Sequence, residues 1–549
     1  MASRQVPPPE EEYYEEGEGE FEEEFAELPA GEPQSFTDSL VAKTPWWVIS
    51  AFVHVVMLGF AALAYGSAGP KEDNEAVVVS PPRQPRQIPE MEKPKDLDPN
   101  KKVLDNPKKV EDPVFRKVEE ADHNESDDDE EFKKMKGDSL DFVSDKPFKG
   151  KGTYDTIGGG GGGGGRYGGR LGGKRDLVNS GGGGSDTEDA VLQALKWLSR
   201  HQEPDGSWRV KEYTAQCNQI PKYATGGKCS PNPGEDHFQA GVTGLSILAF
   251  LGAGYSHLSK DTYDGICFGT VVKKGLKWMI ESQDTEGCIG DRNASQYMYN
   301  HLICALALSE AYGLTGSPLF QSQAQRAVDF TIAAQNPGMG WRYSYKCGDN
   351  DSSVTGWAAM VLKSSELSGL QFPQTGYAGT LAWFDEVTED TYYRVGYTHK
   401  GTGKVYVPGL NEQFDHHESL TAIAVMSRIF VEKKKGDRKI SGGCDLLVKD
   451  LPEWEKDKPN KVDFYYWYYA SLALFQYDGP KGPKWGSWNK AMKDSLVKNQ
   501  NVGSSGCKAG SWETVGRWCG EGGRVYATAI NALTLEVYYR YANVFGAGK

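Results

Sequence analysis

Two acidic side chains stand two residues apart at the start of an apolar segment, in the order Asp349-Asn350-Asp351-Ser352-Ser353. Carboxyl groups that lie close together repel each other, and this repulsion keeps one of them protonated at neutral pH. Asp349 and Asp351 could therefore supply a general acid. The alternative is structural, because Asp351 or Ser352 is also the residue type that caps the first turn of a helix. We favour the cap.

An aromatic run, Phe464–Tyr469, is the second feature that could do chemistry, because the faces of aromatic rings stabilise cations. The run lies inside a helical segment that is apolar nearly all round, which is typical of a buried helix. Core packing is therefore the interpretation we favour for these rings.

The elements that must position these groups are helices in alternation. Apolar helices rich in small residues are expected to begin near Phe238, Tyr297, Ser352, His417, Val462 and Val525. Partner helices are expected to begin near Thr187, Thr270, Gln321, Gly376, Ile440 and Gly486. Six inner and six outer helices over residues 186–545 predict an all-α fold, an (α/α)6 toroid that forms one domain.

In such a ring the N-termini of the inner helices meet at one mouth of the central cavity. Side chains that open the inner helices are therefore the candidates to line it. They are His237, Tyr299, His301, Ser352, Asp415, His416, Glu418, Asp463, Tyr466, Trp467, Arg524 and Tyr526, together with the possible acids Asp349 and Asp351.

A repeat supports the ring: an apolar helix, a glutamine, a short turn, a glycine and then a tryptophan. It occurs four times, with Ile289 in place of the tryptophan in the second copy. The positions are Gln202 and Trp208, Gln283, Gln335 and Trp341, and Gln500 and Trp512. Each glycine follows a helix and ends it.

This pattern resembles the QW motif of squalene-hopene cyclases and the prenyltransferase/squalene-oxidase repeat. The resemblance implies a terpenoid-cyclase toroid in which the motif lies outside the ring and does no catalysis. Asp349-Asn350-Asp351 resembles the first part of the cyclase DxDD motif, whose middle aspartate protonates an olefin. Here Ser352 takes the third acidic position, which weakens the expectation of an isomerase.

Three functions therefore stay open for the ring. It could be a binding module for a polymer, lipid or protein, or a terpene cyclase with Asp351 as the acid. It could also act on a polysaccharide, which requires a carboxylate pair such as Asp351 with Asp415 or Glu418 across the cavity.

The chain before the ring has a different composition. Residues 1–44 carry thirteen acidic and two basic side chains and are expected to be a disordered tail. Residues 45–65 contain no Asp, Glu, Lys or Arg and are long enough to span a bilayer. Residues 66–185 are expected to be a disordered linker. Its first part is rich in proline and charged residues, and its last part is rich in glycine. The net charge of −15 argues against nucleic-acid binding.

Ser50 and His54 share one face of the predicted transmembrane helix. An ionisable side chain at that depth is costly and indicates function. With the Pro/Lys/Glu-rich linker, this segment resembles TonB-type energy transducers, which implies contact with ExbB/ExbD-like motor proteins. Ala61 and Tyr65 depart from that family's pattern, and a plain anchor is the alternative. Both interpretations predict a bacterial inner-membrane protein with a cytoplasmic N-terminus and a periplasmic toroid.

All nine cysteines lie in the ring. A periplasmic domain favours disulfides, and Cys217/Cys229 and Cys507/Cys519 each bracket eleven residues. These pairs are the expected bridges. Since the chain has no CxxC motif and no cysteine near His416 in sequence, we expect no zinc site and no other cofactor.

Overall fold

The computed structural model describes residues 167–171, 173–226, 228–229, 234–400, 418–455 and 461–545. The predicted tail, transmembrane segment and most of the linker lie outside these residues, as do Ser50, His54, Asp415 and His416. Within the described ranges, no helix combines the length and apolarity that a membrane crossing requires.

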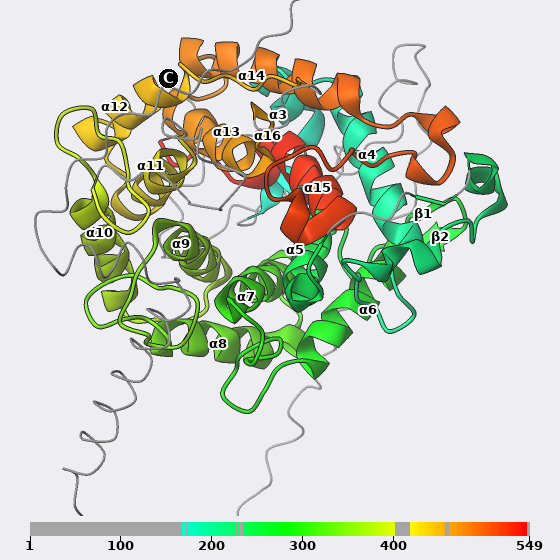
Figure 1. Ribbon diagram of the computed structural model, residues 1–549, viewed down its shortest axis with the longest axis horizontal. Helices are drawn as coiled ribbons and strands as arrows, with labels where there is room; N and C mark the ends of the chain where they lie inside the picture. The colour runs from blue at the N-terminus through cyan, green and yellow to red at the C-terminus, as the bar shows by residue number, and fades with distance from the viewer. Residues whose placement is uncertain are drawn as a thin grey trace, which may run out of the picture. The chain divides into compact units, whose positions relative to one another are not determined.

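Twelve helices form two concentric rings (Figure 1). The inner ring consists of α5 (Gln239–Gly252), α7 (Tyr297–Thr315), α9 (Ser352–Ser368), α11 (Ser419–Glu432), α13 (Phe464–Asp478) and α15 (Cys519–Leu535). The outer ring consists of α4 (Ser185–Arg200), α6 (Phe268–Glu281), α8 (Pro318–Ala333), α10 (Thr375–Val387), α12 (Arg438–Leu447) and α14 (Pro483–Leu496). A short hairpin, β1 (Thr262–Tyr263) and β2 (Ile266–Cys267), precedes α6.

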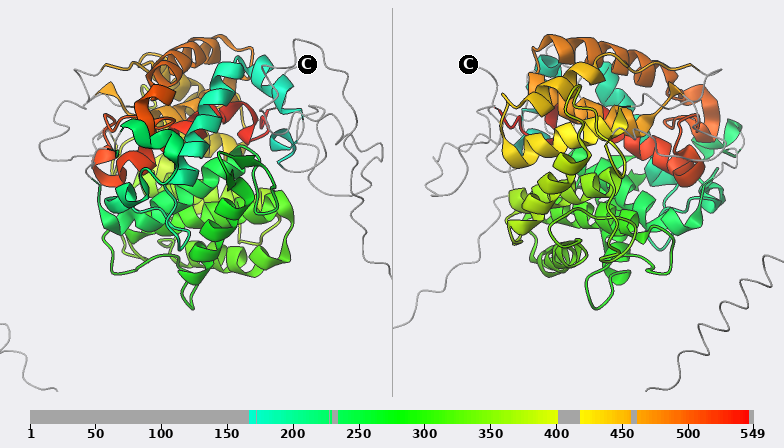
Figure 2. Two further views of the ribbon diagram at one scale, coloured as in Figure 1. Left: turned by 90° about the vertical axis from the view of Figure 1, so that its right-hand side faces the viewer. Right: turned by 60° about the vertical axis from the view of Figure 1, so that its left-hand side comes forward.

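The ring is closed. Each inner helix packs against the next, and α15 returns to pack against both α5 and α4. The side views show the first described segments, in cyan, beside the last ones, in orange and red (Figure 2). The inner helices are buried almost throughout, as their all-round apolarity predicts. The predicted all-α toroid is confirmed.

The repeated glutamines join neighbouring outer helices. The Nε2 of Gln202 donates to Gly206 O in its own turn, at 2.9 Å, and to Val271 O on α6, at 2.9 Å. Gln283 and Gln335 make the same pair of bonds to their own turns and to α8 and α10. Gln500 bonds Gly510 O and Ala190 O on α4, which links the last outer helix to the first.

The tryptophan and glycine of each repeat complete the turn. Trp208, Trp341 and Trp512 donate their indole N–H to a carbonyl near the end of the preceding outer helix, at 2.7–2.8 Å. Gly510 has φ +94°, and a Cβ there would lie 2.1 Å from Gln193 O on α4. Only glycine fits this position. The motif is structural, as the resemblance implies.

The end of the predicted linker is ordered, which corrects our expectation of disorder to residue 185. Residues 168–170 form a 3-10 turn and α3 (Lys174–Gly181) is helical. The glycines at 181–184 are a tight turn rather than a flexible spacer. Gly182 has φ +87°, and a Cβ there would lie 2.6 Å from Asn489 Nδ2. Packing therefore explains these glycines.

This ordered segment closes the end of the ring at which the inner helices terminate. The hydroxyl of Tyr167 bonds Ser364 and Ser368 on α9. Arg170, which is fully buried, pairs with Glu310 on α7 at 2.7 Å and donates to Arg540 O in α16 (Val537–Arg540). In the part of the chain that the structure describes, this segment therefore forms a floor across one end of the toroid.

Candidate functional site

A cavity of about 240 Å³ lies where the inner helices begin. All six inner helices contribute to its wall, because their N-terminal turns converge at this end of the ring. Most of the lining side chains are apolar or aromatic: Phe238, Val242, Leu245, Ile303, Tyr343, Trp357, Tyr397, Leu420, Tyr465, Trp518 and Tyr526. Its volume is below the roughly 300–1,000 Å³ of pockets that enclose drug-sized ligands.

A chain of hydroxyl groups crosses the cavity wall. The Tyr299 hydroxyl donates to Ser353 Oγ at 2.9 Å, and Ser353 Oγ lies 2.8 Å from the Tyr465 hydroxyl. Burial raises the pKa values of Tyr299 and Tyr465 well above the usual tyrosine range. These hydroxyls therefore stay neutral and can orient a ligand through hydrogen bonds, but they supply no charge.

Glu521 is the one carboxylate among the lining residues that the structure describes. Partial burial raises the pKa of Glu521, while His237 opposes the rise. No second carboxylate lines this cavity among the described residues, so the wall that is seen lacks the acid and base pair of a glycosidase.

The two candidate acids lie beside the same guanidinium, that of Arg342, but differ in burial. Asp351 is fully buried and caps α9, because its Oδ1 accepts the Val354 N–H at 2.7 Å. Asp349 is exposed and lies 3.4 Å from Arg342 Nη1. The cap is confirmed, and Asp349 is not among the groups that shift the pKa of Asp351. Burial nevertheless raises the pKa of Asp351 to about 7, against the opposing effects of Val354 N–H and Arg342.

Of the predicted lining residues that the structure describes, Tyr299 and Tyr526 line the cavity. His301 is buried between Ile289 N–H and Thr331, and burial lowers its pKa to about 3. Glu418 is held by Arg394 and Thr421, and neither Glu418 nor Asp351 is among the lining residues of the cavity.

The remaining candidates have structural contacts of their own. Ser352 donates to Gly396 O, Asp463 caps α13, and the Tyr466 hydroxyl donates to Leu447 O and Asp450 O. Trp467 packs on Trp454 and Phe464, and Arg524 pairs with Glu513. His237 offers its backbone carbonyl to Asn300, and its neighbour Phe238 reaches the cavity instead.

Sequence reasoning missed lining residues such as Ser353 and Trp357, which lie one and five residues beyond Ser352. Their four-residue spacing is a detectable signal, because positions i and i+4 share one helix face. The capping residues Asp351 and Asp463 bond to backbone N–H groups of their own helices instead, and neither is among the lining residues. Of the aromatic run, Tyr465 faces the cavity, and the core packing of its neighbours is confirmed.

The cysteines contradict the predicted pairing of Cys507 with Cys519. All nine are free thiols in the structure. Cys507 Sγ lies 3.4 Å from His201 Nε2, and Cys217 and Cys229 lie beside the same nitrogen. Cys519 is not part of this group. The cluster is buried and separate from the cavity lining.

The fold and site define a class, an (α/α)6 toroid with an apolar cavity at one end. No family model matches the chain. No curated protein is significantly similar to it in sequence. Among solved structures, the type II terpene cyclase MstE from Scytonema aligns at 14% identity over 66% of this chain and 99% of its own, with a TM-score of 0.38.

Two carbohydrate-active enzymes align over similar lengths. A family 76 glycoside hydrolase, a mannosidase from Bacteroides thetaiotaomicron, has 10% identity over 64% of this chain and 96% of its own, with a TM-score of 0.40. The endo-beta-1,4-glucanase CMCax from Acetobacter xylinum has 12% identity over 65% and 99%, with a TM-score of 0.35. Similarity at this level assigns neither a family nor an activity to the chain.

Proposed function

We propose that the toroid is a binding module whose cavity takes a small apolar group, such as the end of an isoprenoid chain. The observation that supports this proposal is the wall itself: branched aliphatic and aromatic side chains surround a space of about 240 Å³, with neutral hydroxyls on one side. Pockets of this composition bind through burial of apolar surface, and the few polar groups set orientation.

The enzyme alternatives have less support. A cyclase acid must reach its substrate, yet Asp351 is not among the lining residues and one of its oxygens holds the helix cap. A glycosidase needs two carboxylates on opposite sides of the substrate, and Glu418 is already bound to Arg394. Aromatic rings could also stack on sugars, so glycan binding is an outcome that the experiment must separate from apolar binding.

A farnesyl probe that carries a photoreactive diazirine tests the cavity. We expect the full chain in detergent to be labelled on peptides that contain Trp357 or Tyr465, and excess farnesol to suppress this labelling. Ile303→Trp should fill the cavity and reduce labelling by at least about tenfold. Ile280→Trp, on outer helix α6, is the matched control and should leave labelling unchanged. Labelling that cello-oligosaccharides suppress and farnesol does not would overturn the proposal.

We further propose that residues 45–65 hold this module in a bacterial inner membrane, with the toroid on the periplasmic side, and that an ExbB/ExbD-like motor contacts the anchor. The support is in the sequence: an uncharged 21-residue segment with aromatic ends, and Ser50 and His54 on one face. The motor would act through the linker on the ring, where the ligand is bound.

The motor proposal predicts a specific phenotype for His54→Ala. The variant should reach wild-type abundance in the membrane fraction but lose the in vivo photocrosslinks that a photoreactive residue placed beside position 54 forms with neighbouring membrane proteins. Ala61→Ser, in the same segment, is the control and should retain the crosslinks. If a crosslinker placed beside residue 54 captures only lipid in both proteins, the segment is a plain anchor.

A further inference from the structure

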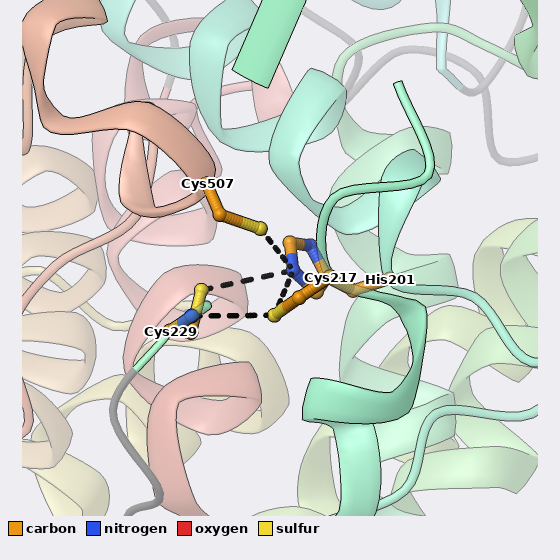
Figure 3. Close-up of side chains that lie close together, drawn as sticks. All are labelled: His201, Cys217, Cys229 and Cys507. Carbon is orange, nitrogen blue, oxygen red and sulfur yellow. Dashed lines mark hydrogen bonds between the residues drawn. The ribbon is translucent and has the colours of Figure 1, made fainter. Parts of the chain in front are cut away.

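Four potential metal ligands meet where the first and last parts of the ring join. His201 ends α4, and Cys217 and Cys229 follow in the long connection from α4 to α5. Cys507 comes from the connection between α14 and α15, 306 residues after His201. Figure 3 shows the three sulfur atoms turned toward one ring nitrogen of His201.

The spacing of these atoms is that of one tetrahedral ion. His201 Nε2 lies 3.5 Å from Cys217 Sγ, 3.7 Å from Cys229 Sγ and 3.4 Å from Cys507 Sγ. Zinc bound at about 2.3 Å to sulfur and about 2.0–2.1 Å to nitrogen places tetrahedral N and S ligands roughly 3.5–3.6 Å apart. All four ligand atoms lie within 4.8 Å of one another.

The imidazole is held in the correct tautomer. His201 Nδ1 lies 2.8 Å from Trp197 O, and a carbonyl oxygen only accepts, so Nδ1 carries the proton. The lone pair of Nε2 therefore faces the sulfurs. The ring also stacks on Trp197, with centroids 4.1 Å apart. A second-shell carbonyl of this kind orients metal-binding histidines in general.

A buried cation near the cluster balances the charge of bound thiolates. Arg200 is 7% exposed, donates to Ala509 O at 2.7 Å and stacks on the Tyr223 ring, and its charge interacts with Cys507 and Cys229 as well as with Asp264. Buried charges require a partner of opposite sign. Three thiolates, one neutral histidine and one divalent ion carry a net charge of −1, which Arg200 offsets.

We propose that His201, Cys217, Cys229 and Cys507 bind one zinc ion that holds the toroid closed. Four protein ligands occupy all tetrahedral positions and all four are buried, so the site is structural and leaves no position for a substrate. The ion would join two long connections whose described residues include the 3-10 turns η6 (Pro221–Gly226) and η10 (Gly503–Lys508). This proposal does not depend on the ligand of the cavity.

A disulfide explains the arrangement less well. Cys217 Sγ accepts the backbone N–H of Cys229 at 3.3 Å, so these two cysteines are close enough to pair. A Cys217–Cys229 bridge, however, accounts for only two of the four groups and leaves the Cys507 thiol with a single hydrogen bond within the described residues, to the Nε2 of His201. A metal ion uses all four groups at once, and soft thiolate ligands favour zinc.

The test is the metal content of the full chain, purified in detergent through a tag without histidine. Mass spectrometry of the metal should find one zinc per chain, and cobalt exchanged into the site should show tetrahedral d–d bands with sulfur-to-cobalt charge transfer. Cys507→Ser should lower the zinc content by at least about tenfold. Cys507→His should retain zinc as a Cys2His2 site, and Cys519→Ser, a buried cysteine outside the cluster, should retain it as well.

Several results would overturn the proposal. They are wild-type protein without zinc, iron in place of zinc, and a thiol titration in denaturant that finds a Cys217–Cys229 disulfide. Zinc that survives Cys507→Ser would also contradict it. Cobalt spectra of the wild-type chain decide the question even if the serine variant fails to fold.

Discussion

Glu310→Ala is expected to lower the free energy of unfolding of the toroid by about 3–5 kcal/mol. The Glu310 carboxylate is fully buried and binds Arg170 at 2.7 Å, Arg540 at 3.1 Å and the Tyr541 hydroxyl at 2.5 Å. Both arginines are fully buried as well. Alanine leaves two guanidinium groups without this counter-charge in the floor of the toroid. Urea unfolding of the full chain in detergent, followed by circular dichroism, measures the loss.

The matched control is Glu281→Ala on outer helix α6, where the glutamate is exposed and pairs only with Lys277. This substitution should change stability by less than about 0.5 kcal/mol. Arg170→Met combined with Glu310→Ala should cost less than the sum of the two single variants, because the double variant removes one of the stranded cations. Strict additivity would show that Arg170 and Glu310 do not interact.

The ion pairs of Glu310 also make the stability of the toroid depend on pH in the acidic range. Burial alone would raise the pKa of Glu310, but Arg170 and Arg540 outweigh it and hold the pKa below the usual range. A lowered pKa in the folded state gives stability that is present above the unfolded pKa and is lost as the pH falls through the folded one. The wild-type protein should therefore lose stability on acidification, and Glu310→Ala should lack this part of the loss.

The ring itself could be predicted from sequence because its signals are local. Two signals are visible within about thirty residues of sequence. One is a helix that is apolar all round, and the other is the glutamine-turn-glycine-tryptophan repeat. The starts of the outer helices were placed within three residues, for example Thr187 for Ser185 and Gly486 for Pro483. The floor was missed, since the burial of Arg170 depends on Glu310 and Arg540, which are distant in sequence.

The cysteine cluster could not be predicted for a related reason. His201 and Cys507 meet only because the ring closes, and no short spacing motif marks ligands that lie so far apart. Equal spacing suggested Cys507 with Cys519, but α15 begins at Cys519 and carries it into the core. Closure of a ring creates sites between its first and last repeats that local patterns do not reveal.

Asp351→Asn is expected to make the protein more stable at neutral and alkaline pH. Asp351 caps α9, and asparagine is an equally good capping residue. The second carboxyl oxygen of Asp351 is buried, lies 4.0 Å from Arg342 Nε and has no hydrogen-bond partner among the described residues. Burial raises the pKa of Asp351 to about 7, whereas the unfolded chain has an ordinary pKa near 3.9.

The sign of the effect follows from proton binding. Between about pH 4 and 7 the unfolded chain releases a proton that the folded protein keeps, so the stability of the wild type falls as the pH rises through this window. Three pKa units correspond to about 4 kcal/mol. Asparagine does not titrate, so the stability of the variant relative to the wild type should increase by about this amount from pH 4 to pH 8.

Asp463→Asn is the contrasting control. Asp463 caps α13 in the same way, and its other oxygen also lies near an arginine, 3.8 Å from Arg517. The Arg517 side chain is more deeply buried than that of Arg342, so replacing Asp463 by the amide removes the ion pair of a buried cation and should destabilise the ring. A flat difference between Asp351→Asn and wild type from pH 4 to pH 8 would mean that Asp351 is ionised throughout, and an ionised carboxylate cannot protonate an olefin. The expected slope would show a protonated acid at neutral pH. The remaining argument against the cyclase alternative would then be that Asp351 does not reach the cavity wall. The photolabelling experiment tests what the cavity binds, and the pH titration tests whether Asp351 is protonated, so the two experiments examine the cyclase alternative independently.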